Sequence, residues 1–70
     1  MAFESRVLSL IDTVVGIDTA YFISGTLFVT GDPDTLPAAV ARAETVLADE
    51  GIRGVIVSKT MSDEFALDFV

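Results

Sequence analysis

The sequence predicts a two-layer α+β sandwich in which two helices cover one face of a four-stranded, mainly antiparallel sheet. Three observations predict this fold class. The chain has 70 residues, which allows one domain spanning 1–70. Two segments carry apolar residues at helical spacing. Each is followed by two short runs rich in β-branched and aromatic residues, so the expected order is helix, hairpin, helix, hairpin.

Residues 3–15 are expected to form the first helix. Gly16 follows them, at a position where a left-handed residue commonly caps a helix. The apolar stripe of this helix would comprise Phe3, Val7, Leu8, Leu10, Ile11, Val14 and Val15.

Residues 19–23 and 26–30 are expected to form the first hairpin around the two-residue link Ser24-Gly25. Pairing Ile23 with Thr26 separates the side chains into an apolar face and a mixed face, which supports this register. The apolar face would carry Ala20, Phe22, Leu27 and Val29. The mixed face would carry Thr19, Tyr21, Ile23, Thr26, Phe28 and Thr30.

The second helix is expected to start after the turn 31–35, with Asp34 or Thr35 accepting hydrogen bonds from its free N–H groups and Pro37 in its first turn. Gly51 is expected to end it. Its buried stripe would be Leu36, Val40, Ala43 and Leu47, flanked by Ala39 and Val46.

Residues 52–59 and 64–70 are expected to form the second hairpin, with Lys59 opposite Glu64 and Arg53 diagonal to Asp68. One face would carry Ile52, Gly54, Ile56, Ser58, Phe65, Leu67 and Phe69. The other would carry Arg53, Val55, Val57, Lys59, Glu64, Ala66, Asp68 and Val70.

The strand order has two solutions. A fully antiparallel sheet results when the third, fourth, second and first strands are neighbours in that order, and this connectivity resembles a circularly permuted ferredoxin-like sandwich in layout alone. The alternative is the sequential order, with a parallel pair at the centre.

Composition excludes several classes of partner and site. The net charge of −7 argues against nucleic acid and anionic membranes as partners. The chain has no Cys and no His, which removes disulfides and zinc-type sites. No apolar run approaches the ~20 residues needed to span a bilayer. The first residues lack the pattern of a signal peptide, so a cytoplasmic location is expected.

The sheet face that the helices leave uncovered is the best candidate for a functional surface. It is expected to present Tyr21, Ile23, Phe28, Val55 and Val57 as an interface, together with Ala66 and Val70. A domain this small usually needs a disulfide, a metal or a partner subunit, and only the last is open here. The edge strand 19–23 has little to block pairing, whereas Arg53 and Lys59 protect the other edge.

Four carboxylates, Asp18, Asp32, Asp34 and Asp63, are expected at one end of the sheet, where they are weak candidates for binding Ca²⁺ or Mg²⁺. Their spacing is not that of an EF-hand, and Asp is common in turns for local reasons. We therefore expect no metal centre and no cofactor.

The preferred function is a small, acidic, non-enzymatic interaction module that self-associates through its open sheet face or an edge strand. The chain lacks a His or Cys to serve as base or nucleophile, so an enzyme is not expected. The alternative is a monomeric adaptor or inhibitor that binds a basic protein partner, for instance by nucleic-acid mimicry. A metal-binding or oligomeric enzyme is the third hypothesis.

Overall fold

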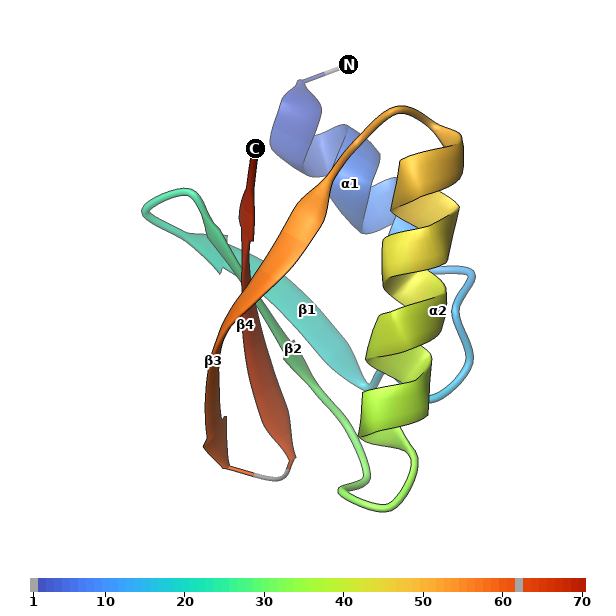
Figure 1. Cartoon of the computed structure of the whole chain (residues 1–70), viewed down its shortest axis with the longest axis vertical. Helices are drawn as coiled ribbons and strands as arrows, with labels where there is room; N and C mark the ends of the chain where they lie inside the picture. The colour runs from blue at the N-terminus through green and yellow to red at the C-terminus, as the bar shows by residue number, and fades with distance from the viewer. Residues whose placement is uncertain (1, 62) are drawn as a thin grey trace.

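The computed structural model describes residues 2–61 and 63–70, apart from the side chains of residues 59–61. Two helices pack against each other on one side of a twisted four-stranded sheet (Figure 1). This confirms the predicted fold class and element order. The elements are α1 (Phe3–Ile11), β1 (Thr19–Ile23), β2 (Thr26–Thr30), α2 (Leu36–Asp49), β3 (Gly54–Met61) and β4 (Glu64–Phe69).

The strands are arranged in the order β1-β2-β4-β3, and every neighbouring pair is antiparallel. This confirms the fully antiparallel order, and the sequential order with a parallel pair is wrong. The connectivity is that of a ferredoxin-like sandwich whose first strand has been moved to the end of the chain. Both edges of the sheet are thereby defined: β1 forms one and β3 the other.

The first hairpin has the predicted register, with Ile23 opposite Thr26 and Tyr21 opposite Phe28. Ser24 and Gly25 form its two-residue turn, with φ angles of 50° and 80°. Positive φ at both central positions is the geometry of a type I′ turn, whose twist matches that of the flanking strands.

The register of the second hairpin is predicted correctly only near its open end. Gly54 pairs with Phe69 and Ile56 pairs with Leu67, as expected. The pairing then shifts twice, so that Ser58 lies opposite Ala66, and Met61 rather than Lys59 lies opposite Glu64. At each shift β3 has one residue more than the stretch of β4 opposite it, which is the pattern of a β-bulge.

The shift also changes the face that Ser58 occupies. We expected Ser58 on the helix-covered face beside Ile56, but its partner Ala66 belongs to the other face. Because side chains alternate with a period of two, one inserted residue is enough to move a side chain across the sheet. The side chain of Lys59 lies outside the described part of the chain.

The core lies between the helices and the covered face of the sheet. The predicted stripe of α2 is confirmed, since Leu36, Ala39, Val40, Ala43 and Leu47 are all buried. The sheet and the adjoining loop contribute Leu27, Val29, Ile52, Phe65 and Leu67. The described residues include no buried polar or charged side chain.

The first helix is shorter than predicted. It ends at Ile11, and its continuation is replaced by a tighter turn in which Val14 N–H donates to the Ile11 carbonyl oxygen at 2.9 Å. The Thr13 hydroxyl donates to the Leu10 carbonyl oxygen, a side-chain bond that competes with helix continuation. Val15 is therefore 82% exposed instead of extending the apolar stripe.

Candidate interaction surface

The uncovered face of the sheet carries most of the predicted interface residues, whereas Val57 lies within the register shift between Ile56 and Ser58. Strand register places Tyr21, Phe28 and Val55 on this face, because their cross-strand partners lie there too. The exposed fractions are 40% for Tyr21, 56% for Ile23, 37% for Val55 and 53% for Val57, whereas Phe28 is half-buried. Four large apolar side chains on one small sheet therefore remain accessible to solvent.

An aromatic pair lies on the β1 side of this surface. The rings of Tyr21 and Phe28 are stacked, with centroids 5.6 Å apart and an interplanar angle of 19°. Cross-strand aromatic pairs of this kind stiffen a sheet and present a flat apolar area. The sequence predicted the pair, because the hairpin register puts the two residues directly opposite each other.

Ala66 differs from the expectation. We expected it to be part of the exposed surface, but it is only 2% exposed. Its small side chain lies in the middle of the sheet, between its cross-strand partners Phe28 and Ser58. Larger neighbours on both sides exclude solvent from a single methyl group. Val70, beyond the end of β4, is almost fully exposed.

Polar contacts border the apolar centre of the face. The Thr26 hydroxyl donates to Asp68 Oδ1 at 2.6 Å, and the Tyr21 hydroxyl donates to Glu64 Oε2 at 3.4 Å. The hydroxyls of Thr19 and Thr30 are also hydrogen-bonded. Arg53 is diagonal to Asp68 as expected, since Gly54 pairs with Phe69 and Val70 N–H donates to the Arg53 carbonyl oxygen. The Thr26–Asp68 contact depends on β2 and β4 being neighbours, which hairpin register alone does not predict.

The two edges of the sheet differ in how well they are protected from pairing with a strand of another molecule. Within the described part of the chain, β1 pairs only with β2, and its five residues are uncharged and regularly paired. The β3 edge contains two register shifts. Bulges and charges discourage pairing with another strand, and β1 has neither.

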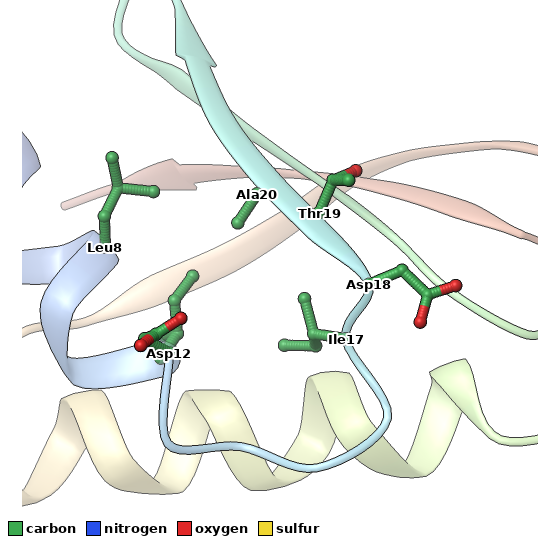
Figure 2. Close-up of a pocket in the computed structure, with 7 residues that line it drawn as sticks. Leu8, Asp12, Ile17, Asp18, Thr19 and Ala20 are labelled. Atoms are coloured by element: carbon green, nitrogen blue, oxygen red, sulfur yellow. The ribbon is translucent and has the colours of Figure 1, made fainter.

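A pocket of about 140 Å³ lies beside the β1 edge, between the end of α1, the loop that follows it and the start of β1 (Figure 2). Its apolar lining comes from Leu8, Ile11, Ile17 and Ala20. The carboxylates of Asp12 and Asp18 flank it from opposite sides (Figure 2). The sequence pattern does not predict this pocket, because the early end of α1 at Ile11 creates it.

The four carboxylates named as weak metal candidates come from loops at one end of the sheet (Figure 1). Asp18 N–H donates to the Thr30 carbonyl oxygen, and Gly31 N–H donates to the Asp63 carbonyl oxygen, which ties these loops together. Even so, no group of three or more acidic side chains in the described residues could hold a metal ion.

Asp32 has a local role at this end of the sheet. Its Oδ1 accepts a hydrogen bond from Asp34 N–H at 2.8 Å, and its carbonyl oxygen accepts one from Leu36 N–H at 2.8 Å. We expected the side chain of Asp34 or Thr35 to cap α2. Thr35 occupies the capping position but makes no side-chain hydrogen bond to the helix.

Comparison of the chain with protein-family models, curated proteins and solved structures finds no match. Within the described residues, neither helix is long and apolar enough to cross a membrane.

Proposed function

We propose that this protein is a non-enzymatic interaction module that self-associates through its sheet, by the uncovered face or by the β1 edge. The observation that carries the proposal is the exposure of Tyr21, Ile23 and Val55 on the face that the helices leave bare. Covering these side chains in an assembly would stabilise it by about 25 cal/mol for each Å² of apolar surface removed from water. A domain of 70 residues has a small stability margin, so such a contact would matter to folding as well as to assembly.

Sedimentation equilibrium over a wide concentration range tests the proposal. We expect a dimer or a higher oligomer whose population rises with concentration. A monomer at every concentration would refute self-association.

One pair of variants separates the face from the edge. Val55→Lys places a charge on the uncovered face, and Val15→Lys places the same charge in the loop after α1. If the face is the contact, Val55→Lys lowers the mass of the sedimenting species and Val15→Lys does not. If the β1 edge is the contact, neither variant changes the mass, because β3 lies at the opposite edge of the sheet.

A second candidate function is favoured by the acids beside the aromatic pair. The Glu64 carboxylate accepts a hydrogen bond from the Tyr21 hydroxyl, and the Asp68 carboxylate accepts one from the Thr26 hydroxyl. Carboxylates therefore border the apolar centre of the face. An aromatic surface bordered by carboxylates complements Lys or Arg side chains. We propose a monomeric adaptor or inhibitor of a basic protein as the function to pursue if the sedimenting species is a monomer.

A further inference from the structure

We infer that β1 is the site at which two copies join, by antiparallel pairing of β1 with β1 of a second copy about a two-fold axis at Tyr21. This inference rests on the proposed self-association and specifies which part of the sheet makes the contact. It predicts a continuous eight-stranded sheet, twice the four strands of one copy. Two features of the edge support it.

The first feature is the direction of the backbone groups. A two-residue hairpin closes on a pair that exchanges both hydrogen bonds, here Ile23 and Thr26. Hydrogen-bonded and non-hydrogen-bonded pairs alternate along an antiparallel ladder. The backbone N–H and C=O groups of Tyr21 are therefore hydrogen-bonded to β2. The N–H and C=O groups of Ala20 and Phe22 therefore point to the open edge, where an added strand can bond to them.

The second feature is that the strand complements itself. With the axis at Tyr21, Ala20 of one copy lies opposite Phe22 of the other, and these are the residues whose backbone groups point outward. Both copies then exchange backbone hydrogen bonds at the same two positions, as a two-fold interface requires. The five residues Thr19–Ile23 carry no charge, so like charges do not meet within the paired strands.

Disulfide trapping tests the inference, because the chain contains no cysteine. In the proposed register the two Tyr21 residues form a non-bonded pair with α-carbons about 4.5 Å apart. That separation lies within the roughly 4.4–6.8 Å that a disulfide spans. Tyr21→Cys should therefore form a covalent dimer under mild oxidation.

Ile23→Cys is the matched control on the same strand and face. Two copies of residue 23 would lie four residues apart along the paired strands, about 13 Å, which is too far for a disulfide. Ile23→Cys alone should stay monomeric on a denaturing gel. Mixed with Thr19→Cys it should give a heterodimer, since those two positions are opposite each other in the proposed register. This mixed pair also keeps Tyr21, so it tests the register if Tyr21→Cys fails to fold.

The outcomes distinguish the inference from the function on which it rests. Trapping of Tyr21→Cys and of the mixed pair supports the β1 edge. If the wild type associates but Tyr21→Cys is trapped no faster than Val15→Cys, the edge pairing is wrong and self-association through the face stands. If the wild type is a monomer at every concentration, both proposals fail. Trapping between β1 and a different strand of the second copy would overturn the two-fold register.

Discussion

The carbonyl oxygen of Gly16 lies directly against Gly31, so that a β-carbon at position 31 would come closer to this oxygen than 3.0 Å, a separation that real side chains do not show. The contact joins the loop after α1 to the loop before α2. Asp18 N–H donates to the Thr30 carbonyl oxygen at 2.8 Å beside it, and Gly31 N–H donates to the Asp63 carbonyl oxygen at 3.2 Å. Three loops are thus held together at one end of the sheet.

Gly31→Ala is expected to destabilise the domain by about 2–3 kcal/mol, because backbone rather than a movable side chain must give way. Gly31 does not have a positive φ, so the loss comes from the contact and not from an unfavourable backbone conformation. Urea denaturation should show a lower midpoint for this variant with an unchanged slope.

Gly25→Ala is the comparison for that variant. A β-carbon at position 25 meets nothing within 4 Å, and only its φ of +80° opposes the substitution. We expect a loss of about 1–2 kcal/mol. A Gly31→Ala variant as stable as the wild type would show that the two loops are not in close contact.

Ser24 offers a stabilising substitution. It has a φ of 50° in the two-residue turn, a conformation that Asn tolerates better than Ser. Ser24→Asn should raise the free energy of unfolding by about 0.5–1 kcal/mol, measured by thermal or urea denaturation. Ser24→Val, which is β-branched, should lower it. A Ser24→Asn variant less stable than the wild type would contradict the assigned turn type.

Leu67 and Ile56 are cross-strand partners with different burial. The sequence predicts both on the covered face, yet Leu67 is 1% exposed and Ile56 is 42% exposed. Leu67→Ala should cost about 3 kcal/mol, comparable to the whole stability of a domain of this size, and leave much of the protein unfolded. Ile56→Ala should cost about 1 kcal/mol or less, because the methyl groups it removes are partly in water already. Equal losses in urea denaturation would contradict the edge position of β3.

Ionic strength should separate the two candidate functions. Each chain carries a net charge of −7, so two copies repel each other. Raising the ionic strength from about 0.01 M to about 0.1 M shortens the Debye length from about 30 Å to about 10 Å. Self-association should therefore strengthen, as measured by sedimentation, whereas binding of a basic protein should weaken, as measured by calorimetry. Self-association that weakens with added salt would be inconsistent with an apolar, uncharged contact.

Local pattern was enough to predict each element of the fold. The spacing of Leu36, Val40 and Leu47 predicted the buried stripe of α2, and the link Ser24-Gly25 predicted the register of the first hairpin. These predictions succeed because helix and strand periods are fixed by backbone geometry, which acts over a few residues. The strand order did not follow in this way: the sequence left two orders open, and the structure has the fully antiparallel one.

The details that shape the candidate surface could not be predicted in this way. The end of α1 at Ile11 depends on a local hydrogen bond from Thr13, which competes with an unbroken apolar pattern. The bulge before Ser58 moves that residue to the other face, and no local signal marks it. The burial of Ala66 depends on the sizes of its neighbours across two strands.

The sequence by itself therefore determined the fold class, the register of the first hairpin and the identity of the apolar face, because each follows from local periodicity and turn length. The tertiary structure decided between the two strand orders. Only the tertiary structure decided which of these residues are exposed, where the Gly16–Gly31 contact forms and where the pocket beside Ala20 opens. The physical reason is that exposure and close contact depend on segments distant in sequence meeting in space, and their fit is set by the packed volume of all the neighbours together.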